Sequence, residues 1–153
     1  MAGIIDIHTH AFPDQVARIA IPALEREGNI KAYLDGTVDG LIASMDRSGV
    51  EKSVICTIAT RQEQFQPILE WCREIRSERI IPFPSLHPRD PLLLDHLQLI
   101  ADEGFKGVKM HPYYQDYFLD DYSLFPLYER MAELGMVLVI HAGYDIAFPR
   151  VRR

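Results

Sequence analysis

Five strand-like runs alternate with helical patterns along the chain, and this alternation constrains the fold more than any other feature. The predicted strands cover residues 3–8, 52–57, 80–86, 105–111 and 136–141. Between them, apolar residues recur at the spacing of a helix that is buried along one side. Gly49, Gly104 and Gly135 stand between a helical pattern and the next strand, where a left-handed helix end is expected. Alternation of this kind predicts an α/β fold with a parallel sheet.

Two connections are longer than the usual strand-to-helix loop of about 2–6 residues. One covers residues 11–37 and leaves room for a short helix near residues 14–26. The other follows the fourth predicted strand and reads "PYYQDYFLDDY". Both follow the carboxyl ends of strands, where α/β proteins build their ligand sites. We therefore expect the functional site at that end of the sheet.

Size, charge and cysteine content narrow the possible functions. The chain of 153 residues is long enough for a single domain, 1–153, with a substantial core. Its net charge of −6 argues against a nucleic-acid surface, which needs a basic patch. No apolar run approaches the roughly 18 residues of a membrane helix, and the N-terminus lacks the pattern of a signal peptide. The two cysteines fit buried positions better than a disulfide framework, so a cytoplasmic protein is expected.

Imidazole side chains gather at the ends of the predicted strands. His8 and His10 in "IIDIHTH" are two positions apart, so the alternation of a strand points both to one face. His141 ends the fifth predicted strand, in "VLVIHAG". A lone histidine is more often a hydrogen-bonded core residue than a ligand, but parallel strands would bring these three together. Neutral imidazole is the commonest protein ligand for zinc and similar ions, so a divalent metal site, preferably for zinc, is predicted.

Lys109 and His111 share a face at the end of the fourth predicted strand, in "GVKMHP". Lys109 has three interpretations: a contact for a substrate carboxylate, a carboxylated lysine that bridges two metal ions, or a partner in a structural ion pair. His111 either orients a substrate or a ligand, or bonds to the backbone of its own loop. We treat both as candidate substrate-binding residues and leave these alternatives open.

Three segments, "IIDIHTHAFP", "GFKGVKMHP" and "VLVIHAG", are similar to motifs of the amidohydrolase-related family. The resemblance runs from Asp6 to Gly143 and implies a metal-dependent hydrolase or decarboxylase on a (β/α)₈ barrel. It assigns His8 and His10 as the ligands from strand one and His141 as the ligand from strand five. The family also uses a histidine after strand six and an aspartate after strand eight, which are expected to orient the substrate and to take the proton. This chain has neither.

The resemblance implies an incomplete barrel, because a (β/α)₈ barrel typically takes about 250 residues. The 153 residues supply about five strands and four or five helices, the N-terminal portion of a metal-dependent hydrolase barrel. Five strands cannot close, so the first and last would have unpaired edges unless a missing C-terminal half or an oligomeric partner covers them. We expect weak metal binding and little activity from this portion alone, with the acid and base residues beyond residue 153.

Hydrolysis of a small ester, amide or lactone by metal-activated water is the main functional expectation. The alternative is metal-dependent decarboxylation of a small aromatic or unsaturated carboxylate, and nothing in the sequence separates the two. A flavodoxin-like or Rossmann-like binding domain would fit the length, but the chain contains no G-x-G and no phosphate-binding loop motif. A serine hydrolase is disfavoured as well, because G-x-S-x-G is absent.

Overall fold

A computed structural model of the chain describes residues 3–143 and 145. It contains five strands: β1 (Ile4–Thr9), β2 (Val50–Cys56), β3 (Ile80–Phe83), β4 (Gly107–Met110) and β5 (Val137–Ile140). β1 pairs with β2, β2 with β3, and β4 with β5, and every pairing is parallel. All five predicted strands are present. β3 is shorter than the predicted strand 80–86 and ends at Phe83, before Pro84.

A short junction joins the two sheets into one strand order. Ser85, just beyond β3, forms an isolated parallel bridge with Lys109 on β4. The N–H of Lys109 donates to the carbonyl of Pro84 at 2.9 Å, and the Ser85 hydroxyl donates to the carbonyl of Lys109 at 2.8 Å. Neighbouring strands therefore follow the chain in the order β1-β2-β3-β4-β5. A doubly wound sheet reverses its order at a switch point, whereas this order is that of a (β/α) barrel. The predicted fold, an incomplete barrel, is confirmed.

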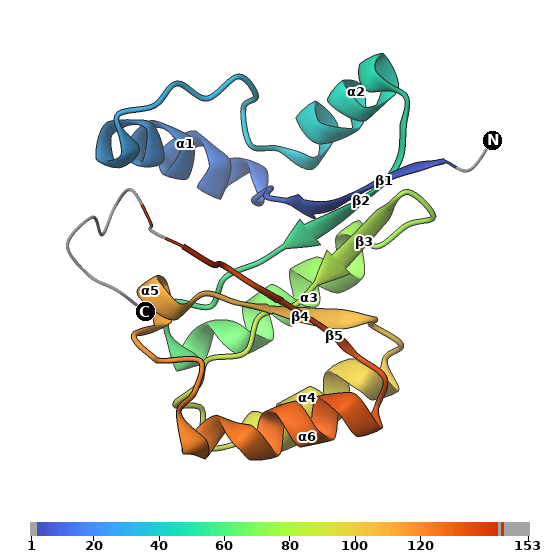
Figure 1. The fold of residues 1–153 in the computed structure, drawn as a ribbon. Coiled ribbons are helices and arrows are strands. Elements are labelled where there is room, and N and C mark those ends of the chain that lie inside the picture. The colour runs from blue at the N-terminus through green and yellow to red at the C-terminus, as the bar shows by residue number, and fades with distance from the viewer. Residues whose placement is uncertain (1–2, 144, 146–153) are drawn as a thin grey trace.

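Six α-helices lie within the described residues, accompanied by two 3₁₀ turns. They are α1 (Asp14–Gly28), α2 (Val38–Ser48), α3 (Phe65–Ile75), α4 (Leu93–Asp102), α5 (Pro112–Gln115) and α6 (Phe125–Glu133), with η1 (Gln62–Gln64) and η2 (Tyr122–Leu124). The prediction of four or five helices missed α5, because a single turn has no apolar period to reveal it. The helix predicted near residues 14–26 is α1. In Figure 1, α1 and α5 lie at the end toward which the strands run.

The helices are held against the sheet by two apolar clusters. Leu69 of α3, Leu97 of α4 and Leu127 of α6 are fully buried with Val108 of β4. In the second cluster, α2 packs on Ile55 of β2. Complete burial of one such side chain contributes about 1.5–3 kcal/mol. Figure 1 shows the result: α2 lies over β1 and β2, while α4 and α6 lie side by side under β4 and β5.

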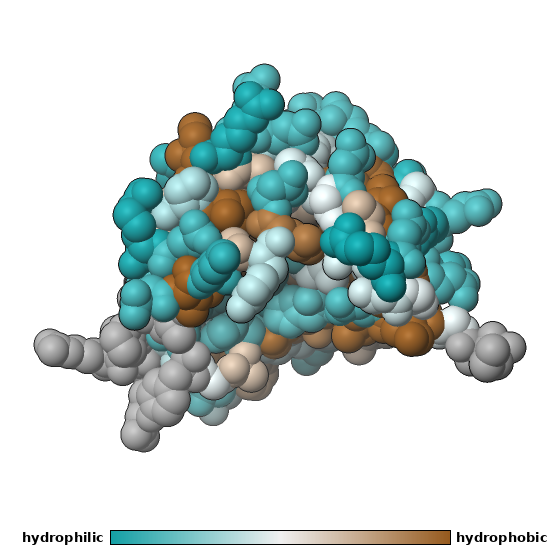
Figure 2. Space-filling view, turned by 90° about the horizontal axis from the view of Figure 1, so that it is seen from above, coloured by the Kyte–Doolittle hydropathy of each residue, from teal (hydrophilic) through white to brown (hydrophobic). Residues whose placement is uncertain are grey.

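The two end strands of the sheet are the least covered. Ile4, Ile5 and Ile7 of β1 are each more than half exposed, at 58%, 56% and 57%, and Val137 of β5 is also exposed. Within the described residues, β1 pairs only with β2 and β5 only with β4. An open edge of this kind is expected where a barrel does not close. Elsewhere, on the face shown in Figure 2, apolar side chains surface in several places among hydrophilic ones.

Among the described helices, none combines the length and the apolar character needed to cross a membrane.

Replacement of Gly107 tests the close approach of β3, β4 and β5. A Cβ at this position would lie 2.4 Å from the carbonyl oxygen of Val137 and 2.4 Å from the ring of Phe83. We expect Gly107→Ala to lower the unfolding free energy by about 3 kcal/mol, because a backbone atom cannot give way. Gly49→Ala is the matched control: it meets no atom within 4 Å, so only its left-handed φ of 69° costs stability, about 1 kcal/mol. Urea unfolding measures both, and equal losses would contradict the strand packing.

Candidate metal centre

His8 and His10 lie together at the carboxyl end of β1, with their ring centroids 5.1 Å apart. Nδ1 of His10 is 2.8 Å from the carbonyl oxygen of Cys56, at the end of β2. A carbonyl can only accept, so Nδ1 carries the proton and the lone pair of Nε2 is left for another group. Metal-bound histidines commonly donate their second ring N–H in this way. The bond to the Cys56 carbonyl thus fixes the His10 ring in the way that metal-binding histidines are fixed, with Nε2 available as the ligand atom.

The surroundings of both rings favour the neutral imidazole. Desolvation lowers the pKa of His10 to about 4, and the neighbouring His8, Lys109 and His141 act in the same direction. Desolvation, Lys109 and His141 also lower the pKa of His8. Both residues still have a large exposed fraction in the open mouth of the sheet, which weakens the desolvation. Neutral imidazole is the form that binds a metal ion.

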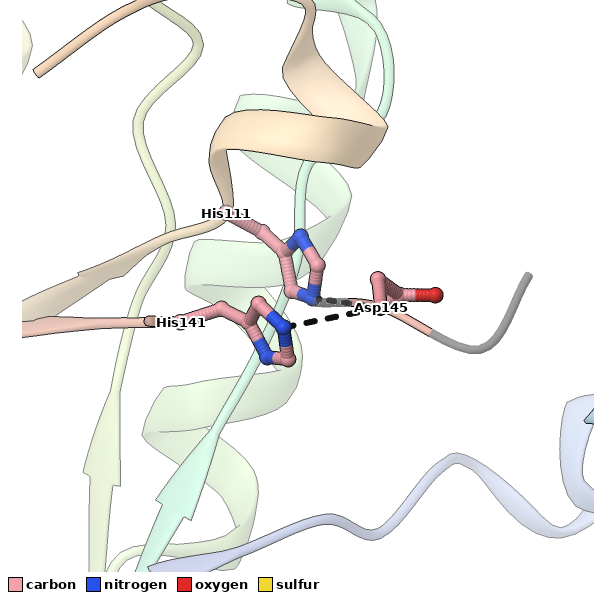
Figure 3. A group of neighbouring side chains, drawn as sticks. All are labelled: His111, His141 and Asp145. Atoms are coloured by element: carbon pink, nitrogen blue, oxygen red, sulfur yellow. Dashed lines mark ion pairs between the residues drawn. The ribbon is translucent and has the colours of Figure 1, made fainter. Parts of the chain in front are cut away.

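His141 follows β5 and contains an unsatisfied atom. Its Nε2 is buried and makes no hydrogen bond to any residue that the structure describes. Such an atom costs about 1–3 kcal/mol unless a bound group satisfies it. The ring stacks on His111, with centroids 4.3 Å apart and an interplanar angle of 16°. In Figure 3 both rings point toward Asp145, whose Oδ2 is 3.5 Å from Nε2 of His111 and 3.8 Å from Nε2 of His141.

The side chains of His111, His141 and Asp145 form a second possible set of ligands. Their donor atoms all lie within 4.8 Å of one another. Two imidazoles and a carboxylate form a donor set that divalent ions use. Asp145 is a residue that the sequence analysis missed, and its one signal is the H-x-x-x-D spacing after β5. His141 thus has its direct contacts with His111 and Asp145.

His111 is the N-cap residue of α5, and its ring is almost fully buried. Its backbone N–H donates to Oε1 of Gln115 at 2.8 Å, and its Nδ1 accepts from the N–H of Tyr114 at 3.5 Å. Desolvation, followed by the influence of His141 and Lys109, lowers the pKa of His111 to about 3. The ring is therefore neutral at pH 7, with Nδ1 as acceptor and Nε2–H as a donor. His111 therefore bonds to the backbone of its own loop through Nδ1. Its Nε2–H is still a donor that could orient a substrate or a ligand, so both interpretations from the sequence stay open.

Lys109 lies inside the group of imidazoles. Its side chain is fully buried, and Nζ is 3.1 Å from Nε2 of His8. Burial lowers the pKa of Lys109. An ammonium at this position donates to the lone pair of His8 that a metal ion would use. Metal binding through His8 therefore requires Lys109 to move away or to give up its proton.

Gln115 ties the loops around the centre to one another, and it too escaped the sequence analysis. It is fully buried and donates to the carbonyls of Ala59 and Leu86, each at 2.8 Å. Its Oε1 accepts from the N–H of His111. One amide thus connects the loops after β2, β3 and β4. Nothing in "PYYQDYF" distinguishes this glutamine from a solvent-exposed one.

A parallel barrel sheet with imidazoles at the carboxyl ends of β1, β4 and β5 defines a class: barrel proteins with a metal-binding mouth. The family model described as Amidohydrolase matches residues 5–151. The chain therefore belongs to the amidohydrolase family, as the resemblance of its three motifs implied.

Solved structures share the fold at low sequence identity. The crystal structure of Metarhizium anisopliae IDCase in apo form has a TM-score of 0.65 and 19% identity, and covers 91% of this chain and 50% of that chain. The 5-carboxyvanillate decarboxylase LigW2 from Novosphingobium aromaticivorans, with bound manganese and 3-methoxy-4-hydroxy-5-nitrobenzoic acid, has a TM-score of 0.64, 16% identity and the same coverage. LigW from Sphingomonas paucimobilis, also a 5-carboxyvanillate decarboxylase, has a TM-score of 0.62 and 16% identity, with coverages of 91% and 51%. The chain thus spans about half the length of these structures. Among curated protein sequences, none matches it.

Loss of the Gln115 amide should destabilise the chain. Gln115→Leu keeps the size of the side chain but leaves the carbonyls of Ala59 and Leu86 without their donor, at an expected cost of about 2–4 kcal/mol. Gln66→Leu is the matched control, because Gln66 is exposed on α3 and bonds only locally to Glu70. Its cost should stay within about 0.5 kcal/mol. Comparable losses in urea unfolding would show that Gln115 does not tie the loops together.

Stability measured with a chelator present should fall as the pH drops from 7 to 4. The pKa of His111 is lowered from 6.5 to about 3 by folding, so the unfolded chain binds a proton that the folded chain does not. In that window stability rises with pH, and the full stabilisation, up to about 4 kcal/mol, is present above pH 6.5. Urea unfolding at several pH values gives the slope. His111→Asn should make the slope shallower, since asparagine keeps the N-cap and does not titrate, while His8 and His10 still contribute; an unchanged slope would contradict the assignment.

Proposed function

We propose that this chain forms the metal-binding mouth of a barrel enzyme that removes CO₂ from a small aromatic or unsaturated carboxylate. The observation that carries the proposal is the contact of the buried Lys109 with His8, 3.1 Å from Nζ to Nε2, beside His10 at the carboxyl end of β1. Two of the structures that share the fold are 5-carboxyvanillate decarboxylases, which favours decarboxylation over the hydrolysis expected from the sequence.

As ligands of a divalent ion we propose His8, His10 and His141. Two features fit this role: Nε2 of His141 is buried without a hydrogen bond to the described residues, and the Nδ1–H of His10 donates to the Cys56 carbonyl. When bound, such an ion supplies a Lewis acid that polarises a carboxylate or carbonyl oxygen and lowers the pKa of bound water. Zinc suits the imidazole donors, and the manganese bound in LigW2 makes manganese an equal candidate.

Lys109 and His111 are proposed to bind the substrate. The Lys109 ammonium contacts Nε2 of His8. When substrate binds, the ammonium would contact the substrate carboxylate instead, and Nε2 of His8 would be free to bind the ion. His111 is neutral and would donate a hydrogen bond from Nε2, as its Nδ1 contact with the Tyr114 N–H requires. The proton that replaces CO₂ on carbon is assigned to a residue beyond 153, in keeping with the family pattern.

Residues 1–153 are proposed to be the N-terminal portion of a larger barrel. The exposed isoleucines of β1 and the half-length match to the solved structures support this. Further strands, from the same chain or from another copy, would cover the β1 and β5 edges and close the mouth around the substrate.

Hydrolysis is the second candidate function, and the family description favours it. A metal-activated water that attacks a small ester, amide or lactone would use the same three ligands. The two functions differ in product, and so can be separated directly.

Metal binding by the 153-residue chain tests the ligand assignment. Titration calorimetry with Zn²⁺ and Mn²⁺ should show that His8→Asn, His10→Asn and His141→Asn each weaken binding by about tenfold or more. His96→Asn is the matched control, because His96 belongs to α4, where its ring stacks on Phe65 and pairs with Asp90. Equal binding by the three variants and the control would rule out the proposed ligands.

Product analysis separates the two reactions. The natural gene product, loaded with Mn²⁺ or Zn²⁺, should release CO₂ from aromatic carboxylates, and Lys109→Met should abolish the release. Turnover of lactones or esters without CO₂ from any carboxylate would favour the hydrolase instead.

A further inference from the structure

Beside His10 lies a cavity of about 380 Å³. We call it the ring pocket. Its apolar walls come from the start of α1, the loop after β2 and the first turns of α3, and include Phe12, Val16, Ile58, Ile68 and Trp71. Its volume is at the small end of the roughly 300–1,000 Å³ of ligand sites, which suits a single ring.

The lining explains what the ring pocket can accept. Among the described residues that line it, none is Asp, Glu, Lys or Arg, and the polar side chains are His10, Thr57, Thr60 and Gln64. Burial of an unpaired carboxylate among such groups is costly. The pocket therefore suits the uncharged part of a molecule, and the aromatic faces of Phe12 and Trp71 favour a flat one.

A charged group of the same molecule could lie immediately outside the ring pocket, next to His10. His10 lines the pocket and bonds through Nδ1 to the carbonyl of Cys56, which lines it too. His8 lies on the same face of this strand end, with its ring centroid 5.1 Å from that of His10, and Nζ of Lys109 is 3.1 Å from Nε2 of His8. His10 thus lines the apolar ring pocket and also lies next to the His8–Lys109 contact.

We propose that the ring pocket holds the aromatic ring of the substrate while its carboxylate reaches the His8–His10–Lys109 group. This inference rests on the proposed function and adds the ring-binding residues to it. Specificity for a single flat ring would then come from Phe12, Ile68 and Trp71, and not from the metal ligands.

Trp71 is the only tryptophan of the chain, so its fluorescence reports directly on the pocket. We would titrate the chain with benzoate, benzyl alcohol and acetate, each with and without Mn²⁺. Benzoate and benzyl alcohol should change the emission in a saturable way, and acetate should not. Mn²⁺ should tighten the binding of benzoate severalfold and leave that of benzyl alcohol unchanged.

A variant pair tests the location. Val16→Phe fills the pocket from α1 and should weaken benzoate binding by about tenfold or more, whereas Val16→Ala leaves the space open and should retain it. Val16 is 46% exposed, so the fold tolerates both, and circular dichroism confirms this.

Three results would overturn the proposal. The first is no saturable response to either ring compound, and the second is equal benzoate affinity in the two Val16 variants. The third is a benzoate affinity that is the same with and without bound Mn²⁺. Calorimetry reports separately whether Mn²⁺ binds. If it does not bind, the proposed metal site fails, while the responses to benzyl alcohol and to Val16→Phe still decide whether the pocket holds a ring.

Discussion

The junction between β3 and β4 is the contact on which the rest of the structure depends. Without the bonds that Lys109 and Ser85 make across it, the chain would be two separate sheets of three and two strands. The junction brings the carboxyl ends of β4 and β5 to the same mouth as those of β1 and β2. It also buries Lys109, because the residue that forms the bridge carries its side chain into the imidazole group. The same residue thus serves the fold through its backbone and the site through its side chain.

Much of the fold could be predicted from the sequence, because its signals are local. The apolar periods, the glycines at helix ends and the long connections of 11–37 and 112–122 each reflect a few neighbouring residues. α5 could not be predicted, since its single turn depends on the buried Gln115 and on loops far away in the chain. Strand order has no local signal either; the family resemblance implies it.

Local sequence signals also predict one part of the candidate site and miss the other. His8, His10, His141, Lys109 and His111 stand at strand ends, so the pattern that predicts the strands also places them at one mouth. Asp145 lies beyond β5 in a loop, and its approach to His111 follows from tertiary structure alone. The ring pocket likewise draws on three separate segments. The choice between hydrolysis and decarboxylation had no local signal at all, and its present support comes from proteins of similar fold.

X-ray absorption at the zinc edge, on the chain loaded with one equivalent of Zn²⁺, tests most directly whether imidazoles from β1 and β5 hold a single ion. The spectrum should show about three imidazole nitrogens at about 2.0–2.1 Å, and the double variant His8→Asn/His10→Asn should lose two of them. An unchanged spectrum in that variant would contradict the assignment and place the ion on His111, His141 and Asp145 instead.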